Sequence, residues 1–445
     1  MTSFRSPPPE LDPARPLPGG VVLCLLAVIA GAATGFVAGA FRWCLERISE
    51  WRAELLIWAE RLDGPGWLIP VVVAAAGAAL AASIVGLVPR AVGSGIQDVE
   101  AVDRGDLAAP PLRVLPAKFV GGLLALGSGL VLGREGPSVH MGAALGAEAG
   151  RRARRSDAEV RVLQTSLAGA GLAVAFTAPI GGALFVFEEV AKSFWPKVVL
   201  PTLLGVAAAV SCSRLILDDR PDFDVRDVAV PGFELLPAFV VFGVLTGLLG
   251  ALYNVFVIRA LTLADRAARV PQVVKAAAVG ALVGLALVLA PLTAGGGDEL
   301  SQLLLGGSTL AVPLLLVYLA IRFVAGPLSY AAGTPGGLFA PLLAVGALWG
   351  ALFARLVDAV LPGHEVGVAM AIVGMAAFFA ATVRAPLTGV VLVVEMTTIT
   401  SVAVPMLAAA GAAVLTATLV RSAPIYDTLR ERMLQHSGGS GPSTA

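Results

Sequence analysis

The sequence is poor in charged residues and in the side chains that build metal sites and disulfides. Charged residues make up only 14% of it, whereas a soluble domain carries about 25%. Its formal net charge is zero, which gives no reason to expect nucleic acid or an acidic partner. The three cysteines and three histidines lie far apart, without a CxxC pair. We therefore expect no disulfide framework, no metal site and no cofactor.

Sequence signatures of common enzyme sites are missing as well. The GxSxG, HExxH and ExxH patterns do not occur, and there is no Walker A lysine. The Gly169-Ala170-Gly171 segment lacks the third glycine and the acidic residue of a dinucleotide-binding fold. An enzyme active site inside a membrane would need a nucleophile with its base or a metal cluster. The sequence therefore does not favour an enzyme.

Long apolar runs dominate the sequence instead. Hydrophobic residues make up 57% of it, and a spanning helix needs about 20 apolar residues. Val21–Phe41 and Trp67–Val88 carry no charge over that length. Further apolar blocks cover about 119–133, 162–187, 198–213, 235–258, 276–297, 303–321, 323–354, 366–383 and 396–420. We predict an all-α polytopic membrane protein, and its glycine-broken segments are typical of transporters, where interrupted helices line a cavity.

The two ends differ in composition from this apolar body. Residues 1–20 form a Pro-rich tail, and residues 433–445 are expected to form a Gly/Ser-rich tail. Between them we expect one transmembrane domain over 21–432. A cleaved signal peptide is not expected, because the first apolar run has full spanning length.

The two halves of this domain resemble each other in sequence. Lys118-Phe-Val-Gly-Gly122 reappears as Arg322-Phe-Val-Ala-Gly326, and glycines and prolines downstream keep the same spacing. Ala178-Pro179-x-x-Gly182-x5-Glu188 matches Ala385-Pro386-x-x-Gly389-x5-Glu395. These ordered matches predict a duplication. We place the first repeat at about 21–218, the second at about 230–420 and a C-terminal helix at about 422–432.

Charge near equivalent loops indicates how the two copies are oriented. Five arginines lie within residues 151–161, after the first copy, whereas only Arg355 lies between the second copy and Arg384. By the positive-inside rule the first loop is cytoplasmic and the second is not. Equivalent loops on opposite faces are typical of an inverted repeat, which places the substrate site near the membrane midplane.

Three glycine-rich segments precede or open helix-like stretches. They are Gly93-Ser94-Gly95-Ile96, Gly133-Arg134-Glu135-Gly136-Pro137 and Gly336-Gly337-Leu338-Phe339-Ala340-Pro341. A helix N-terminus has free N–H groups and partial positive charge, so it attracts an anion, and glycine lets the backbone approach the ion. Several such ends together would hold an anion weakly enough to release it. Close helix packing is the alternative explanation for each segment alone.

The three segments together closely resemble signatures of the CLC family of chloride channels and chloride/proton antiporters. The family's GSGIP, GREGP and GGIFAP appear here as GSGIQ, GREGP and GGLFAP, in the same order. The resemblance extends from about residue 20 to residue 432. It implies many tilted and broken helices in two inverted-topology halves, a homodimer in the lipid bilayer with one pore per subunit, and chloride and protons as the transported ions.

The resemblance also implies roles for individual residues. Ser94 and Tyr426 correspond to the side chains that coordinate the central anion, and the backbone amides of Leu338 and Phe339 correspond to the donors opposite. Further candidates for anion binding in the same motifs are Gly95, Ile96, Gly136 and Gly337. Gln97 stands where the family usually has Pro, a departure that bears on the turn and on anion preference.

Glu135 corresponds to the family's gating glutamate, and its chemistry suggests the same role. A carboxylate among anion-binding helix ends is itself a competing anion. Deprotonated, it blocks the site, and protonated, it leaves, so that its proton is linked to anion movement. Ionisable residues in membrane segments are functional candidates by default. The alternative is a salt bridge with Arg134.

Glu189 matches the family's internal proton glutamate, which favours antiport because channel members usually lack an acid there. The alternative is a helix-end carboxylate paired with Lys192. Glu188 has a repeat partner in Glu395, so we interpret that pair as structural, and we expect His140 to be a spectator beside the pathway.

We therefore predict a chloride/proton antiporter of the bacterial inner membrane. The alternatives are a passive chloride channel and an antiporter for fluoride or nitrate. Ser94 argues against both anion variants, because those members of the family tend to replace this serine.

Overall fold

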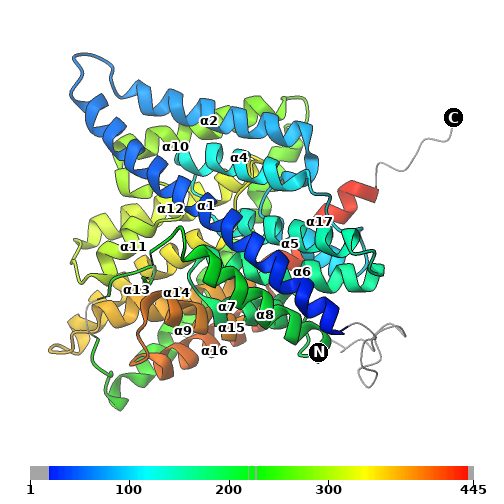
Figure 1. Cartoon of the computed structure of the whole chain (residues 1–445). Helices are drawn as coiled ribbons and strands as arrows, with labels where there is room; N and C mark the ends of the chain where they lie inside the picture. Colours follow the sequence, from blue (N-terminus) through cyan, green and yellow to red (C-terminus); the bar gives the residue numbers. More distant parts are fainter. Residues whose placement is uncertain (1–19, 219, 226–227, 439–445) are drawn as a thin grey trace.

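The computed structural model describes residues 20–218, 220–225 and 228–438, and within them the chain is helical, without a strand (Figure 1). The first half contains α1 (Gly20–Glu60), α2 (Leu68–Leu87), α3 (Ile96–Asp103), α4 (Val114–Gly127), α5 (Glu135–Arg152), α6 (Asp157–Ala175), α7 (Pro179–Phe185) and α8 (Pro196–Ser213). The second half contains α9 (Leu236–Arg266), α10 (Gln272–Leu289), α11 (Asp298–Leu305), α12 (Val312–Ala331), α13 (Phe339–Val360), α14 (Gly367–Val383), α15 (Pro386–Thr397) and α16 (Ala403–Leu419). Helix α17 (Ile425–Gly438) follows both halves.

The C-terminal helix extends beyond its expected end. We expected it to end near residue 432 and a Gly/Ser-rich tail to begin at 433, but α17 continues to Gly438. The reason is compositional, since Met433-Leu434-Gln435-His436 are compatible with a helix and the Gly/Ser run starts only at Ser437. The N-terminal tail up to residue 19 and the C-terminal residues 439–445 lie outside the described residues.

Seven helices in the described part of the chain are long and apolar enough to cross a membrane. They are α1, α2, α8, α9 together with the short 3₁₀ turn before it (Phe233–Arg266), α10, α12 and α13. Many of their large apolar side chains face outward, as do Val21, Leu80 and Leu289. Such a surface would be unfavourable in water but matches a lipid environment.

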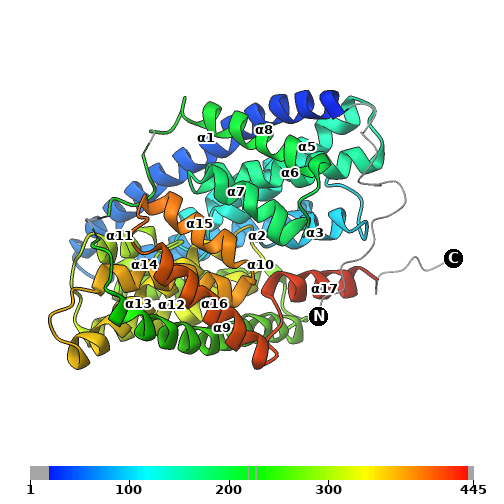
Figure 2. The ribbon, with the colours of Figure 1, turned by 90° about the horizontal axis from the view of Figure 1, so that it is seen from below.

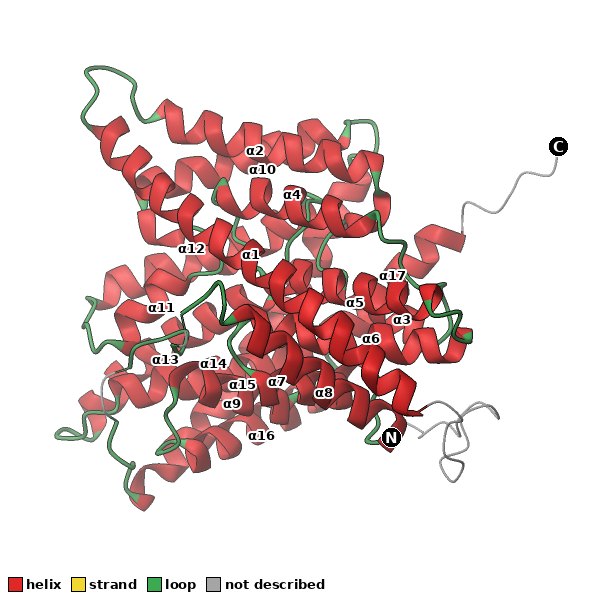
Figure 3. Ribbon diagram, viewed as in Figure 1, coloured by secondary structure: helices red, strands yellow, loops and turns green. Residues whose placement is uncertain are grey.

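Several helices are short or interrupted. The apolar block 323–354 is divided at its glycine-rich segment, where α12 ends at Ala331 and α13 begins at Phe339. The block 162–187, which we expected as one apolar run, is divided between α6 and α7, a break that the glycines did not predict. Figure 3 shows helices of unequal length and varied direction joined by loops. The breaks occur at Gly333–Leu338 and at Phe176–Ala178, in the interior of the protein.

Glycines matched by the repeat pack equivalent helix pairs. A Cβ at Gly142 on α5 would lie 2.2 Å from the carbonyl oxygen of Leu167 on α6. At Gly346 on α13 it would lie 2.3 Å from the carbonyl oxygen of Gly374 on α14. Only glycine allows these backbones to approach so closely. Helices α5 and α6 therefore correspond in packing to α13 and α14.

Two buried cations at matching positions of the repeat also make equivalent hydrogen bonds to loop carbonyls. Lys118 on α4 donates from Nζ to the carbonyl of Gly93 at 2.6 Å, just before α3. Arg322 on α12 donates to the carbonyls of Thr293 at 3.0 Å and Gly296 at 2.5 Å, just before α11. Both side chains are fully buried. Each therefore fixes the loop that leads into a short helix of its own half, and carbonyl oxygens compensate for the buried charge.

The matched glutamates join the two halves where α7 and α15 lie side by side (Figure 2). Glu188, after α7, accepts hydrogen bonds from the backbone N–H groups of Leu387 at 3.1 Å and Thr388 at 2.6 Å, at the start of α15. Glu395, near the end of α15, accepts from Ile180 at 2.9 Å and Gly181 at 2.6 Å, at the start of α7. The two segments therefore run antiparallel, which is the arrangement that an inverted repeat produces.

Candidate functional site

The three glycine-rich segments, far apart in sequence, are hydrogen-bonded to one another. The N–H of Gly93 donates to Thr334 at 3.1 Å, and that of Gly336 donates to Gly93 at 3.0 Å. Gly133 and Gly337 exchange two hydrogen bonds of 2.9 Å. Helices α3, α5 and α13 begin next to this frame, at Ile96, Glu135 and Phe339. The fold therefore brings three helix N-termini, each with partial positive charge, to one buried region.

The carboxylate of Glu135 lies on the N-terminus of α13. Its Oε1 accepts a hydrogen bond of 2.7 Å from the backbone N–H of Phe339, and the side chain is fully buried. A Cβ at Gly133 would lie 2.0 Å from Oε2, and a Cβ at Gly337 would lie 2.1 Å from Oε1. The absence of side chains at these two glycines therefore leaves room for the carboxylate. The carboxylate accepts from the N–H of Phe339, a donor that we expected to bind the transported anion.

Ser94 and Tyr426 place two buried hydroxyl groups near the same helix ends. Both residues are fully buried, neither hydroxyl makes a hydrogen bond of good geometry to the described residues, and the two hydroxyls lie close enough to interact with each other. A Cβ at Gly136 would lie 2.8 Å from Ser94 Oγ and 3.0 Å from Gly337 Cα, so the start of α5 contacts the other two motifs. The Tyr426 ring packs edge-on against Phe339, with centroids 5.4 Å apart. Buried hydroxyl groups are normally hydrogen-bonded, and a bound anion could accept the hydrogen bonds of these two.

The remaining predicted anion-binding residues lie in the first turns of the same helices. Gly95 adopts a left-handed conformation (φ 89°) directly before α3, which Ile96 begins. Leu338 directly precedes α13, and Gly136 is the second residue of α5. All are buried, so these backbone positions face the interior and not lipid.

Glu189 lies in a second buried cluster, away from the three motifs in the chain. It belongs to a π-helical turn, Val186–Val190, and is 2% exposed, with an Oε1 that has no hydrogen-bond partner among the described residues. Lys192, the partner considered in the alternative, forms an ion pair of 3.2 Å with Asp427. Asp427 also pairs with Arg104 at 2.9 Å.

An aromatic contact connects the two clusters. Phe185, at the end of α7, packs against the ring of Phe339 with centroids 5.7 Å apart. The backbone N–H of Phe339 holds Glu135, and the turn that carries Glu189 follows Phe185. Buried side chains therefore fill the region between the two glutamates.

The sequence reasoning missed Glu100, a second carboxylate beside Glu189. Glu100 lies on α3, which packs against the turn that carries Glu189, and its side chain is fully buried. Neither of its carboxylate oxygens has a hydrogen-bond partner among the described residues, and Arg430 Nε lies 4.0 Å from Oε2. The sequence feature that could have identified Glu100 was its position as an acidic residue in the short helix that follows the Gly93-Ser94-Gly95 segment.

His140 lies beside the candidate anion site, where we expected a spectator residue. Its ring lies against Gly95, where a Cβ would come within 2.3 Å of Nδ1. Its Nε2 is 3.4 Å from Oδ1 of Asp98, which pairs with Arg90 at 2.6 Å. His140 therefore supports the loop that carries Ser94.

A sequence model of the family described as voltage gated chloride channel matches residues 76–418. The chain belongs to this family, the CLC family. The expected family and the expected all-helical fold are thereby confirmed.

Individual relatives agree with this family. The chain is 35% identical to a protein of Vibrio parahaemolyticus named H(+)/Cl(−) exchange transporter ClcA, over 93% of this chain and 90% of the relative. Among solved structures, a slow cyanobacterial Cl−/H+ antiporter matches with a TM-score of 0.86 and 30% identity, over 93% of this chain and 98% of that one. A CLC-type fluoride/proton antiporter, 21% identical, matches with a TM-score of 0.73 over 91% of this chain and 97% of that one, and this likeness shows the fold alone.

Membership of the CLC family and the apolar helices establish a multi-pass integral membrane protein, as the sequence predicted. Among the described residues, no group of three or more histidine, cysteine or acidic side chains is arranged to hold a metal ion.

Proposed function

We propose that the protein exchanges chloride for protons across a membrane. The observation that carries this proposal is the Glu135 carboxylate, bound to the backbone N–H of Phe339 at the start of α13. A carboxylate at this position is a stand-in for an anion, since it takes the same donor. The names of the relatives, exchangers of H+ and Cl−, support chloride and protons as the two ions.

In this mechanism Glu135 is the outer gate. While it is deprotonated, its charge is stabilised by the N–H of Phe339 and by the partial positive charge of helix ends, so it excludes chloride. Once protonated, it no longer carries a charge and binds the helix end more weakly. Chloride then takes the Phe339 donor, and the proton on Glu135 is available for transfer, which links the movements of the two ions.

The chloride site itself comprises the hydroxyls of Ser94 and Tyr426 and the backbone at the helix starts. The two hydroxyls donate, as do the N–H groups of Leu338 and Phe339. Gly95, Ile96, Gly136 and Gly337 supply backbone around the ion. Because partial charges of neutral donors hold the anion, binding stays weak enough for rapid release.

Glu189 is the inner proton acceptor in this proposal. It is buried beside a cluster of charged groups that includes Lys192, Arg104 and Asp427, which are partly exposed. Such a location allows a proton to arrive from water and to be held away from the chloride route. Transfer to Glu135 then has to pass the region of Phe185 and Phe339.

The test uses purified protein in liposomes, with a chloride gradient and a proton-sensitive dye. We expect chloride to drive protons against their own gradient, because both ions use one cycle. Replacing Glu189 by alanine should retain chloride flux and abolish the driven proton movement. Chloride flux without proton movement in the unmodified protein would instead establish a passive channel, and coupling that survives Glu189→Ala would reject the role of Glu189.

We also propose that the protein is a homodimer with inverted halves in a bacterial inner membrane. Family resemblance and the bacterial origin of its relatives support these three points. The antiparallel contacts between α7 and α15 support the inversion. Chemical crosslinking in native membranes would test the dimer, and a ladder that stops at one subunit would contradict it.

A further inference from the structure

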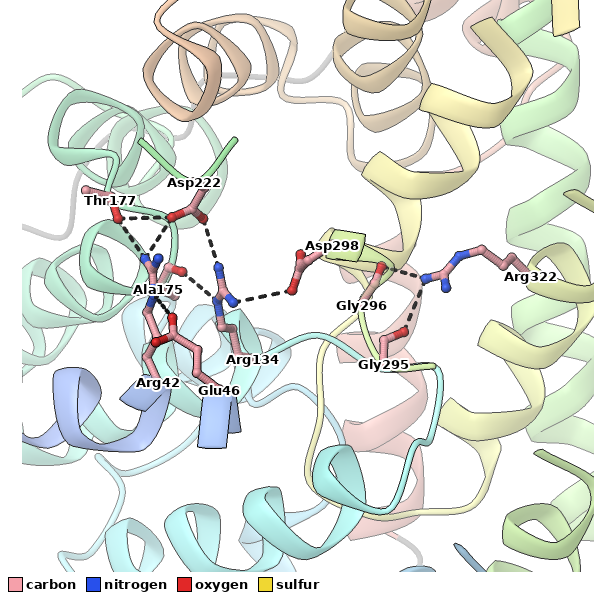
Figure 4. Close-up of polar contacts among 10 residues, drawn as sticks. All are labelled: Arg42, Glu46, Arg134, Ala175, Thr177, Asp222, Gly295, Gly296, Asp298 and Arg322. Atoms are coloured by element: carbon pink, nitrogen blue, oxygen red, sulfur yellow. Dashed lines mark hydrogen bonds and ion pairs between the residues drawn. The ribbon is translucent and has the colours of Figure 1, made fainter. Parts of the chain in front are cut away.

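The segment that joins the two halves places a buried carboxylate next to the outer gate. Asp222 lies between α8 and α9, and its side chain is 2% exposed. One carboxylate oxygen is 2.8 Å from Arg42 NH1, and the other is 2.9 Å from Arg134 NH2 (Figure 4). A single carboxylate therefore compensates for two guanidinium groups.

The other acidic partners of these two arginines are more exposed. Arg42 also pairs with Glu46 at 2.9 Å, and Arg134 also pairs with Asp298 at 3.3 Å. The side chains of Glu46 and Asp298 are 46% and 47% exposed, so solvent screens their charges. Asp222 is out of water, and its charge acts on Arg134 with little screening.

The position of Asp222 is fixed by both halves of the protein. The next residue, Phe223, donates from its backbone N–H to Met396 at 3.0 Å. Asp224 exchanges two hydrogen bonds with the side chain of Gln302, at 2.9 and 2.7 Å. Thr177, in a left-handed conformation (φ 49°), donates to Asp222 at 3.0 Å. The linker therefore holds this carboxylate in one place.

Arg134 transmits the charge of Asp222 to the gate. It directly precedes Glu135, at the N-cap position of α5, and its side chain donates to the carbonyl of Ala175, the last residue of α6, at 2.8 Å. A cavity of about 460 Å³ adjoins this site and is lined by Arg134, Asp222 and Ala340, which follows Phe339. The charge of Arg134 therefore acts electrostatically both on Glu135 and on an anion that approaches α13.

We propose that Asp222 is a positioning residue that sets, through Arg134, the proton concentration at which the outer gate opens. This inference rests on the proposed role of Glu135. Without the carboxylate, Arg42 and Arg134 would keep only their more exposed partners, Glu46 and Asp298, and the deprotonated form of Glu135 would be stabilised by the excess positive charge. The charged groups facing Asp222 are Arg42 and Glu46 on α1, Arg134 before α5 and Asp298 on α11. The groups that act on Glu135 are Arg134, Asp298 and Tyr426.

The test compares the pH profiles of chloride flux in liposomes for Asp222→Asn and the unmodified protein. We expect the profile of Asp222→Asn to move to lower pH by up to about one unit, the size expected when one weakly screened charge near a carboxylate is removed. Asp222→Glu, which keeps the carboxylate, should restore most of the original profile. Asp224→Asn is the matched control, since Asp224 is exposed in the same linker, and its profile should not move.

Arg42→Gln provides a variant with the opposite expected sign. Removing one cation leaves Asp222 to act on Arg134 alone, so the profile should move to higher pH. This variant keeps the inference testable if Asp222→Asn does not fold. Shifts of equal sign in the two variants, or no shift in either, would overturn the inference.

A Glu135→Ala background separates this inference from the proposed function. Flux through Glu135→Ala should be independent of pH, and adding Asp222→Asn should change nothing. If Glu135→Ala alone remains pH-dependent, the proposed gate is wrong whatever Asp222 does. If Glu135→Ala is flat but Asp222→Asn behaves like the unmodified protein, only the role of Asp222 is rejected.

Discussion

At the scale of single residues, two features define the candidate site. Two hydroxyl groups are free to donate hydrogen bonds, and one carboxylate accepts a hydrogen bond from a backbone N–H group at a helix start. The hydroxyls of Ser94 and Tyr426 make no hydrogen bond of good geometry to the described residues, while Glu135 accepts from Phe339. A buried donor without an acceptor costs about 1–3 kcal/mol, so the site favours a ligand that supplies negative charge. The backbone N–H of Phe339 cannot serve Glu135 and chloride at once.

Ser94→Ala should weaken chloride binding by about tenfold, the value of one lost hydrogen bond to a charged ligand. Isothermal titration of chloride into the detergent-purified protein measures this change. Ser83→Ala is the control, because Ser83 lies exposed on α2 and bonds only to its own helix, at Ala79. An unchanged affinity in Ser94→Ala would remove this hydroxyl from the proposed site.

At the scale of elements, the sequence predicted the glycine-rich break before α13 and the starts of three important helices, but not the break between α6 and α7. Gly-rich motifs indicated that α3, α5 and α13 begin where they do, because glycine permits the turn and the close backbone approach. The short length of α3 and α11 and the π-helical turn around Glu189 did not follow from the sequence. Such details depend on tertiary packing more than on local preference.

Gly142→Val should lower the unfolding temperature, since a Cβ there would lie 2.2 Å from a backbone oxygen of α6. Overpacking of this kind costs about 1–3 kcal/mol. Thermal unfolding in detergent measures the shift. Gly411→Ala on α16 should leave stability unchanged, because nothing lies within 4 Å of the added Cβ. Equal unfolding temperatures of the two variants would contradict the prediction, because they would mean that α5 can move away from α6 at little cost.

At the scale of the whole molecule, the two halves are joined by exchanged contacts. Glu188 caps the start of α15, and Glu395 caps the start of α7. The sequence interpretation of this pair as structural agrees with these contacts. The linker adds a third connection through Asp222 and Phe223, which ties α1, α5 and α15 together.

Glu188→Gln and Glu395→Gln should destabilise the protein by similar amounts, about 1.5–3 kcal/mol each, because each removes a charged acceptor from two backbone N–H groups. Unfolding in detergent against denaturant measures both. Glu431→Gln, at an exposed position on α17, is the control. Strongly unequal effects would contradict the equivalence of the two segments.

The sequence by itself determined the membrane class and the identity of the motif residues, and it predicted the duplication, since composition and residue spacing do not depend on the tertiary fold. It also named Glu135, Glu189, Ser94 and Tyr426 as candidates. Only the tertiary structure decided which donors Glu135 takes, that Glu100 lies beside Glu189, and that Asp222 joins Arg42 to Arg134. These contacts link segments far apart in the chain, and no local pattern specifies which distant side chain will share a buried charge.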